Sequence, residues 1–280
     1  MSSINTNVSA MNALSIMRNV NSDLSQTQER ISTGSKVNSA KDNAAYFAIS
    51  ETMKGDSGMY KSIDEGLTMT KNVVSTARLG AETFADLAGQ VSERVAFAQG
   101  VGVNLADVQS EVDALTERMS TVIEQSTFNG VSMVDNTDTQ TVVTGVSRNG
   151  TGFDTTSIDI DGQDLSAILA TFTSIDLVAA GSATATTANL EAMLTTAEGA
   201  VADSITAATN LGISEKSIDT QQGFLKDLTD RLDKGVGSLV DADMEKEAAR
   251  LQALQVQQQL ATQSLSIANQ APQNIMALFR

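Results

Sequence analysis

Carboxylates in DIDGQD, residues 159–164, have the spacing that comes nearest to a chemical site. Asp159, Asp161 and Gly162 would occupy positions three, five and six of a calcium-binding EF-hand loop. That alignment places Ile168 where the loop requires a glutamate that binds calcium with both oxygens. The segment therefore fails as a calcium site, and we interpret it as a turn with solvated carboxylates.

Composition excludes the common catalytic centres. The 280 residues contain no histidine and no cysteine, so the chain cannot build the usual nucleophilic triads, thiolate metal sites or disulfides. We therefore expect a protein that is not an enzyme, with no catalytic, cofactor-binding or metal-binding residues. The net charge of −16 also argues against nucleic-acid binding, because phosphate contacts need a basic surface.

Hydroxyl groups are the remaining candidates for chemistry. The 17 serines and threonines between residues 136 and 190 are acceptors for O-linked glycans if this segment faces outward, and unmodified loops are an equally good interpretation. Asn149, Gly150 and Thr151 match the acceptor for N-linked glycans, which is a weak signal in a bacterial protein. Neither pattern assigns a function by itself.

The two chain ends carry almost no charge, although the whole chain is acidic. Residues 251–279 contain no Asp, Glu, Lys or Arg, and residues 1–17 contain none either. Eight glutamines in residues 251–279 would leave amides unpaired in hydrocarbon, so this stretch is not a membrane span. Its ten large apolar residues also distinguish it from a disordered polar tail. The simplest interpretation is that both ends are buried together while the middle stays solvated.

Helical periodicity is the strongest structural signal. Apolar residues recur at steps of three, four or seven in residues 1–33, and Gly34 ends this pattern. A capping box at Ser39–Asp42 predicts the start of the next helix. The apolar seam of residues 49–98 follows a heptad pattern from Ile63 onward, and Asn104 is a candidate N-cap for a third helix.

The pattern changes in the middle of the chain. Residues 127–130 form a turn signal, and residues 141–147 and 157–161 alternate with period two, which predicts a β-hairpin. A short helix is predicted at residues 164–172, and the low-complexity residues 179–188 are predicted to form a loop.

Helical spacing returns from Leu194 onward, so three helices lead into the middle and two lead back. A chain that runs out and back through helices should fold as an antiparallel bundle. We predict a mainly α fold with a small β-hairpin region. It would be a long antiparallel helical bundle or coiled coil, with the N- and C-terminal helices paired at one end.

Energetics predict that the ends need neighbours. Burying the ten large apolar side chains of residues 251–279 contributes at most ~15 to 30 kcal/mol. Fixing the backbone costs ~1 to 2 kcal/mol for each of these 29 residues. We therefore expect the ends to be poorly ordered in an isolated chain and helical when many copies pack around them. An intramolecular coiled coil is the alternative.

Several stretches resemble bacterial flagellin in the same order along the chain. They are SINTNVSAMNALSIM near the start, LSQTQERISTGSKVNSAKDNAAYFAIS at 24–50, STFNGVSMVD at 126–135 and DADMEKEAARLQALQVQQQLATQSLSIANQAPQNIMALF at 241–279. The resemblance covers about 135 residues at the start and about 90 at the end. The short middle and the ending LFR look like an alphaproteobacterial member.

The resemblance implies a structural subunit that polymerises into the extracellular flagellar filament for swimming. The N-terminus lacks a cleavable signal peptide, and the resemblance implies export by the flagellar type III apparatus. Residues 1–38 and 240–280 would form the inner coiled-coil tube. Residues 39–137 and 190–239 would form the surrounding bundle with its β-hairpin element, and residues 138–189 a short, surface-exposed variable region. The implied partners are other copies of the chain, an export chaperone, and the filament cap and hook-junction proteins.

The candidate subunit-packing residues are apolar positions at both ends. They are Ile4, Val8, Met11, Leu14, Met17, Val20, Leu24, Leu251, Leu254, Leu260, Leu265, Ile275, Leu278 and Phe279. Two alternatives to the filament subunit stay open: a hook–filament junction protein of the same system, and a secreted helical adhesin that acts as a monomer.

A stretch of the second predicted helix resembles the site through which Toll-like receptor 5 senses some family members. The family stretch reads Arg-x-Arg-Glu-Leu-Ala-x-Gln, and its counterpart here is SERVAFAQ at 92–99. Arg94 matches the second arginine, but Ser92 replaces the first. Ser92, Arg94 and Gln99 are therefore a candidate receptor-facing patch whose departure from the pattern argues against strong recognition.

Overall fold

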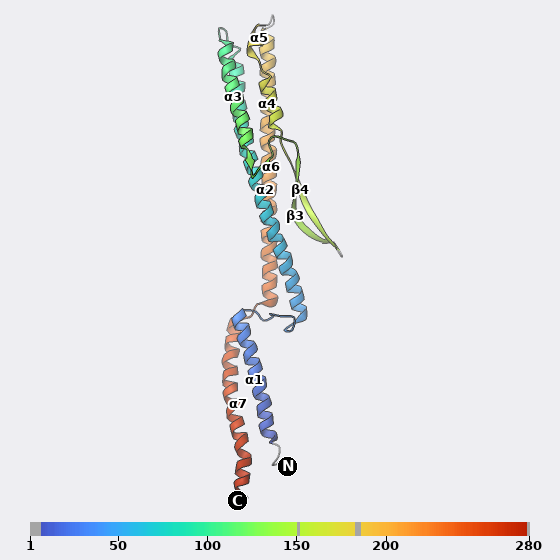
Figure 1. The fold of residues 1–280 in the computed structure, drawn as a ribbon, viewed down its shortest axis with the longest axis vertical. Coiled ribbons are helices and arrows are strands. Elements are labelled where there is room, and N and C mark those ends of the chain that lie inside the picture. The colour runs from blue at the N-terminus through green and yellow to red at the C-terminus, as the bar shows by residue number, and fades with distance from the viewer. Residues whose placement is uncertain (1–6, 150–151, 183–185, 279–280) are drawn as a thin grey trace. The chain divides into compact units, whose positions relative to one another are not determined.

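The computed structural model describes residues 7–149, 152–182 and 186–278, whose arrangement is drawn in Figure 1. Its helices are α1 (Val8–Thr33), α2 (Ala44–Phe97), α3 (Leu105–Gln125), α4 (Leu165–Thr173), α5 (Leu177–Ser182), α6 (Thr186–Val240) and α7 (Met244–Leu278). Its strands are β1 (Thr127–Phe128), β2 (Val131–Ser132), β3 (Thr139–Asn149) and β4 (Gly152–Asp161). The predicted mainly α fold with small antiparallel strand pairs is confirmed.

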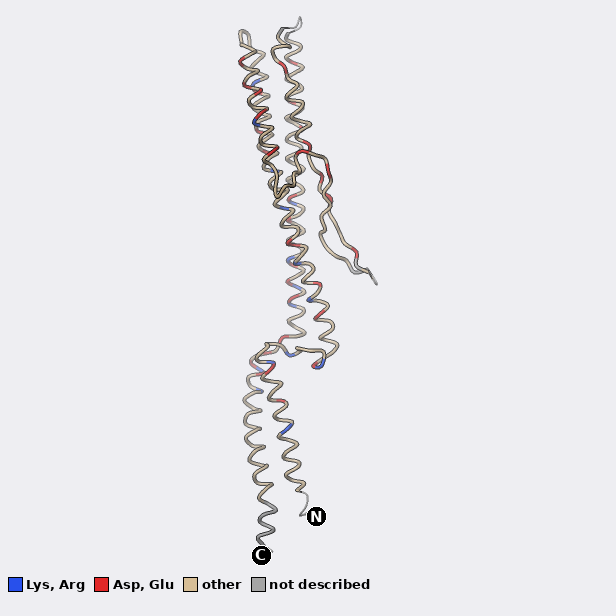
Figure 2. The backbone as a smooth tube through the Cα atoms, viewed as in Figure 1, with Lys and Arg blue, Asp and Glu red and all other residues tan. Residues whose placement is uncertain are grey.

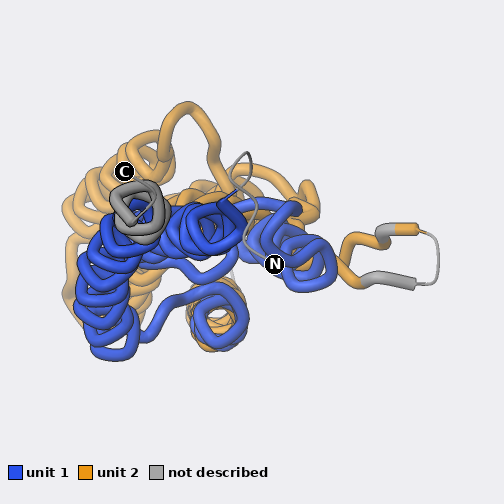
Figure 3. The backbone as a smooth tube through the Cα atoms, turned by 90° about the horizontal axis from the view of Figure 1, so that it is seen from below, with its two compact units in different colours: residues 1–57, 230–280 blue, residues 58–229 orange. Residues whose placement is uncertain are grey.

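The chain divides into two compact units, which are coloured separately in Figure 3. Unit 1 contains residues 1–57 and 230–280, and unit 2 contains residues 58–229. The long helices α2 and α6 contribute residues to both units. Both chain ends belong to unit 1, as their shared lack of charge predicted.

Unit 2 is built on α2 and α6, whose buried side chains repeat every seven residues. The repeats are Leu67, Val74, Ala81, Ala88 and Val95, then Ala77, Phe84, Val91 and Ala98, and on α6 Leu190, Ala197, Ser204, Leu211, Ile218 and Leu225. This spacing keeps one apolar seam facing the partner helix, which is coiled-coil packing. The predicted heptad is confirmed, but Ile49, placed at the start of the seam, is 50% exposed and lies before the repeat begins.

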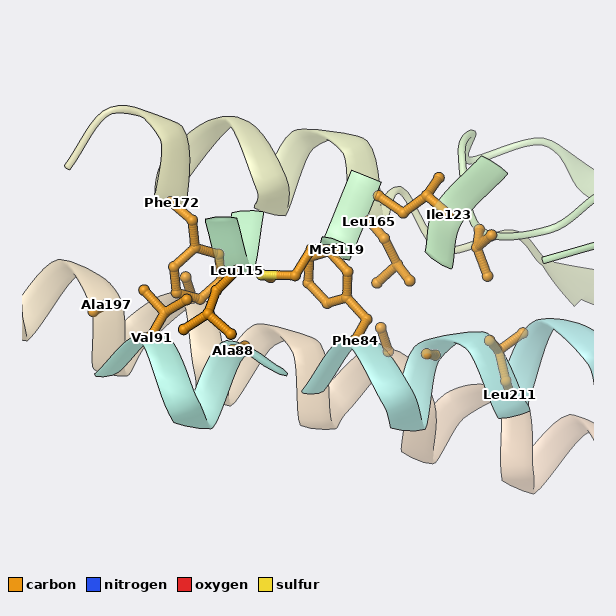
Figure 4. Close-up of a cluster of buried hydrophobic side chains, with 14 of the residues drawn as sticks. Phe84, Ala88, Val91, Leu115, Met119, Ile123, Leu165, Phe172, Ala197 and Leu211 are labelled. Atoms are coloured by element: carbon orange, nitrogen blue, oxygen red, sulfur yellow. The ribbon is translucent and has the colours of Figure 1, made fainter. Parts of the chain in front are cut away.

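Helices α3 and α4 close the core of unit 2. Figure 4 shows side chains from α2, α3 and α4 converging, including Met119 of α3. The rings of Phe84 and Phe172 meet edge to face with their centroids 6.4 Å apart, and both residues are fully buried. This arrangement is one that aromatic pairs prefer, so it fixes α4 against α2 with specific geometry.

Both ends of α3 are defined by local contacts. The Asn104 side chain accepts a hydrogen bond from the Ala106 amide at 3.2 Å, which confirms the predicted N-cap. At the other end, Ser126 lies so close to Gly80 of α2 that a methyl group on Gly80 would be 2.6 Å from its Cβ. Asn129 and Gly130, with φ of 52° and 79°, then form the predicted turn, between β1 and β2.

The hairpin of β3 and β4 is hydrogen-bonded to the long helices beside Thr144. Its antiparallel ladder has an irregularity beside Thr144. There the Tyr60 hydroxyl donates to the Val146 carbonyl at 3.0 Å, and Gln221 Nε2 donates to the Thr144 carbonyl at 2.8 Å. One side chain from α2 and one from α6 therefore bind the hairpin here, and Ile160 of β4 is buried in the core.

The strands are longer than predicted, and side-chain hydrogen bonds join them where β3 begins and β4 ends. The hydroxyls of Thr139 and Thr141 donate to the carboxylates of Asp161 and Asp159, each at 2.8 Å. Asp159 and Asp161, which aligned with calcium-binding positions, are thus bound by threonines of the opposite strand. Across the described ranges, no group of three or more His, Cys, Asp or Glu is arranged to hold a metal ion.

Helices α4 and α5 fold the middle of the chain back onto the bundle. The Asp164 side chain caps α4 by accepting from the Ala167 amide at 2.8 Å. Gln109 of α3 then holds the turn after α4, because it accepts from the Leu177 amide at 2.9 Å and donates to the Ile175 carbonyl at 3.2 Å. Leu177, Ile175 and Ala180 are consequently buried.

The loop predicted for residues 179–188 is wrong at both ends. Helix α5 continues to Ser182, and α6 already begins at Thr186. Residues 183–185, the centre of the predicted loop, lie outside the described residues. Burial of α5 against α3 outweighs the low helix propensity of its glycine and serine.

Ion pairs follow one edge of α2 and α6 within unit 2. Lys71 Nζ lies 2.5 Å from Asp219, and Arg78 pairs with Glu215 at 2.6 Å and with Glu82 at 2.5 Å. Asp219 raises the pKa of Lys71, and Glu215 and then Glu82 raise that of Arg78. Because these side chains are partly exposed, the pairs contribute little stability and mainly mark the antiparallel alignment.

In unit 1 a backbone clamp joins the segments that follow α1 and precede α7. Gly34 ends α1 with a φ of 72°, and its carbonyl accepts from the Ala242 amide at 2.8 Å. The Lys36 amide donates to the Val240 carbonyl at 2.6 Å. These bonds bring the two chain segments together where α1 and α7 begin to pair.

The start of α2 differs from the predicted capping box. Asp42 accepts hydrogen bonds from the Asn38 and Ser39 amides and from the Ser39 hydroxyl, at 3.0 to 3.1 Å. This closes a turn that precedes the helix. The N-cap role falls instead to Asn43, whose side chain accepts from the Ala45 and Tyr46 amides, each at 3.1 Å.

Candidate subunit interface

The α1–α7 pair is antiparallel, and three polar contacts between described residues cross it along its length. Asn7 Nδ2 donates to the Ala268 carbonyl at 2.8 Å, and Gln258 Nε2 donates to Asn21 Oδ1 at 2.7 Å. Arg30 Nη1 lies 3.3 Å from Glu247 Oε1. From one contact to the next, the residue numbers rise along α1 and fall along α7. The contacts therefore define both the direction and the register of the pair.

A single seam joins the two helices. Its less exposed side chains are Ala10, Ala13, Met17, Val20, Leu24, Thr27 and Ile31 on α1, facing Glu247, Leu251, Leu254, Gln258, Ala261, Leu265 and Ala268 on α7. Both sets follow alternating steps of three and four residues, the spacing of a coiled coil. Several of these residues are only half-buried, so the seam is narrow.

Outside the seam, both helices expose large apolar side chains. On α1, Val8 and Met11 are 64% and 63% exposed, and on α7, Leu260 and Ile267 are 62% and 60% exposed. With Val256 these α7 residues form a second stripe, which at 100° per residue lies opposite the seam. We call Val256, Leu260 and Ile267 the outer stripe of α7. Exposed apolar stripes of this kind mark protein contacts.

A groove of about 700 Å³ runs between the helices on one side of the pair. Its apolar lining comes from Ile16 and Val20 of α1 and from Leu260 and Ala261 of α7, with small polar side chains such as Ser264 between them. Figure 2 shows that α7 carries no charged side chain beyond its first turns. The surface can therefore receive an uncharged helix without burying an unpaired charge.

The structure separates the predicted packing residues into two groups. Met17, Val20, Leu24, Leu251, Leu254 and Leu265 face the seam, whereas Val8, Met11, Leu14 and Leu260 are exposed. Before Met17, Ala10 and Ala13 occupy the seam instead, and the role of Val8, Met11 and Leu14 in subunit packing stays a prediction. Ile4 and Phe279 lie outside the described residues, as do the side chains of Ile275 and Leu278.

Sequence reasoning missed three exposed residues: Ile16, Val256 and Ile267. The signal was present on α7, because Val256, Leu260 and Ile267 follow steps of four and seven that are offset from the steps of the seam. Two heptad patterns on one helix give little net amphipathicity, which hid the second pattern.

The candidate receptor-facing residues do not share one face. Ser92 is half-buried, and Arg94, two residues further along α2, points about 200° away and pairs with Glu111 of α3 at 3.3 Å. Gln99 is exposed in the turn after α2. Their role in receptor binding stays a prediction.

Comparison with known proteins shows the family to which the chain belongs. Residues 4–139 match the bacterial flagellin N-terminal helical region, and residues 194–279 match the bacterial flagellin C-terminal helical region. The chain therefore belongs to the bacterial flagellins, the structural subunits of the extracellular flagellar filament. Among the described helices, none is long and apolar enough to cross a membrane.

Individual relatives match along the full length. Flagellin FljM of Caulobacter vibrioides is 35% identical over 100% of this chain and 99% of its own length. A flagellin of Brucella melitensis biotype 1 is 35% identical over 100% of both chains, and Flagellin C of Rhizobium meliloti is 32% identical over 100% of both chains. The similarity to Caulobacter and Brucella flagellins agrees with the predicted alphaproteobacterial character.

Proposed function

We propose that this chain is exported by the flagellar type III apparatus and polymerises, through its α1–α7 pair, into a filament rotated for swimming. One observation supports this most directly: the pair exposes large apolar side chains outside its seam and an apolar groove beside the seam. A second copy of the chain is the natural occupant, because repeated contacts between non-identical surfaces generate an open helical polymer.

Each part of the chain has a place in the layers of the proposed filament, from the centre outward. Residues 1–38 and 240–280 form the inner tube, residues 39–137 and 190–239 the surrounding bundle, and residues 138–189 the outer surface. Phe172 and Leu177 belong to residues 138–189 and are buried in the bundle. Their burial leaves a short outer surface and supports the absence of a separate outer domain. An export chaperone and the cap and hook-junction proteins are the further partners of this proposal.

Removal of residues 261–280 tests the assembly role. The shortened chain should fail to polymerise when warmed with seed fragments, because Ile267 of the outer stripe and the groove residues Ala261, Ser264 and Ala268 are lost. The thermal unfolding of unit 2 should persist, since its core lies within residues 58–229. Electron micrographs and circular dichroism provide the two measurements. Filaments from the shortened chain would overturn the proposal.

A point substitution sharpens the test. Leu260→Ser should raise the critical concentration for polymerisation about tenfold or more, since a buried leucine contributes ~1.5 to 3 kcal/mol. Gln259→Ser, at the neighbouring exposed position, is the matched control and should polymerise normally. Filament length separates a filament subunit from a junction protein, and receptor or cell binding that survives the deletion would favour the adhesin.

A further inference from the structure

Glu247 is a charged residue in an otherwise uncharged seam. It is 7% exposed and lies on the face of α7 that packs on α1. Arg30 reaches its Oε1 at 3.3 Å, whereas Oε2 is buried and has no hydrogen-bond partner among the described residues. Burying a carboxylate is costly, and a pair of this kind is often no more stabilising than apolar residues of the same size. Stability alone therefore does not explain why a carboxylate is placed here.

The rest of the seam repeats too regularly to define a register. Beyond Glu247 it contains Leu251, Leu254, Gln258, Ala261 and Leu265, none of them charged. Sliding α7 by seven residues, about 10.5 Å, would place apolar or amide side chains against apolar ones again. Such a slip changes the hydrophobic contacts little, so the apolar seam does not strongly exclude it.

A slip of seven residues is costly for Glu247. The observed contacts place residue 247 level with residue 30 and residue 258 level with residue 21. After a slip in one direction, Glu247 would lie level with Asp23 and Leu24, against an apolar side chain and a second carboxylate. After a slip in the other direction it would pass the end of α1 at Thr33. In both cases the ion pair between Arg30 and Glu247 is broken.

We propose that Glu247 is a positioning residue that sets the axial register of α7 against α1 through Arg30. A single polar position that specifies register at some cost in stability is a known device in coiled coils. The proposal rests on the proposed function, because the register decides whether Ile16 and Leu260 stand side by side in the groove that a second copy would enter.

Two other features compete with this explanation. The backbone clamp between Gly34 and Ala242 also restrains the register. Glu247 additionally lies in the first turn of α7, where any carboxylate favours the helix, and Glu245 shares that turn. Glu245 is exposed, so Glu245→Leu removes the same end effect without touching the seam.

Engineered disulfides test the register because the chain has no cysteine of its own. Asn21→Cys with Gln258→Cys reports the observed register, since these side chains touch at 2.7 Å. Asn21→Cys with Leu251→Cys or with Leu265→Cys reports a slip of seven residues in either direction. Each pair is placed in four backgrounds: unchanged, Arg30→Met with Glu247→Leu, Arg30→Glu with Glu247→Arg, and Glu245→Leu.

The observed-register disulfide should dominate in the unchanged, charge-reversed and Glu245→Leu backgrounds. In the Arg30→Met, Glu247→Leu background, the slipped disulfides should rise about tenfold while helicity is retained. Intramolecular disulfides are read on non-reducing gels, from the full chain in solution and after seeding. An unchanged disulfide distribution in that background would show that the clamp suffices and would overturn the proposal.

The outcomes also separate the register proposal from the proposed function. A chain that forms filaments with mixed registers in every background contradicts the role of Glu247 and leaves the filament role intact. A chain with one register that never forms filaments supports the role of Glu247 and contradicts the filament role.

Discussion

The two helix pairs of this chain have the same seam periodicity and different outer faces. In unit 2, α2 and α6 pack along a heptad seam, and α3 and α4 cover them so that Phe84 and Phe172 are fully buried. Around that core the exposed edge carries ion pairs such as Lys71 with Asp219. In unit 1, α1 and α7 share one narrow seam, and their outer faces carry apolar side chains and amides. Periodicity therefore identifies a helix pair, whereas the outer faces of the helices tell whether the pair needs a further partner to cover its apolar surface.

Hydrogen exchange should give the largest contrast between the two pairs. In the isolated chain, amides of α7 from residue 251 onward should exchange at least about a thousandfold faster than those of α2 near Phe84. Core amides exchange only after an opening that costs several kcal/mol of free energy. In filaments both should be protected. Strong protection of residues 251–278 in the isolated chain would mean that the α1–α7 pair is complete by itself.

Core truncation should affect unit 2 next most strongly. Phe84→Ala should lower the free energy of unfolding by ~3 to 5 kcal/mol, because it leaves a cavity beside Phe172. Leu79→Ala, on the exposed face of the same helix, should change it by no more than about 0.5 kcal/mol. Denaturant unfolding followed by circular dichroism measures both. Equal effects would contradict the assignment of the core.

Alanine substitutions at two glycines of α2 should change the stability of unit 2 by smaller amounts and in opposite directions. Gly80→Ala should destabilise unit 2 by ~1 to 3 kcal/mol, because its methyl group would collide with Ser126 at the end of α3. Gly89→Ala has open space and should stabilise the helix by ~0.5 to 1 kcal/mol. The melting temperatures of the two variants should move in opposite directions. A rise for Gly80→Ala would mean that α3 shifts readily on α2.

The turn before α2 should give the smallest effect, and one that depends on pH. Hydrogen bonds from the Asn38 amide and from the Ser39 hydroxyl and amide hold the pKa of the Asp42 carboxyl below its ordinary value. Its contribution is therefore fully present above the unfolded pKa and is lost as pH falls through the folded one. Exchange of the Asn38 and Ser39 amides should accelerate over this acidic range relative to its intrinsic rate. Asp42→Asn should remove that pH dependence.

The fold was largely readable because its strongest signals are local and repeated. The heptad of α2, the Asn104 cap and the Asn129–Gly130 turn each follow from a few neighbouring residues. Helix α5 was not readable, because it depends on Gln109, which is 68 residues before the Leu177 amide that it binds. The cap of α2 moved to Asn43 because Asp42 was already engaged by the turn.

The composition of the sequence predicted that an interface exists at the chain ends, but only part of its geometry. The lack of charge in residues 251–279 indicated burial among neighbours, but it did not tell which residues face α1 and which face outward. That division needed the contacts of Asn21 with Gln258 and of Arg30 with Glu247, which join residues more than 200 positions apart. Tracing the heptad of α7 backward from Leu254 would have placed Glu247 in the seam.

The unbroken repeat of seven in α2 and α6 restricts how this bundle can change in length. One inserted residue would rotate every later side chain of that helix by about 100° and turn Phe84 or Leu211 out of the core. Two whole turns added to both helices at the same level would keep every later residue in phase. Lengthened or shortened versions of the bundle should therefore differ by multiples of seven residues, gained or lost in both helices together.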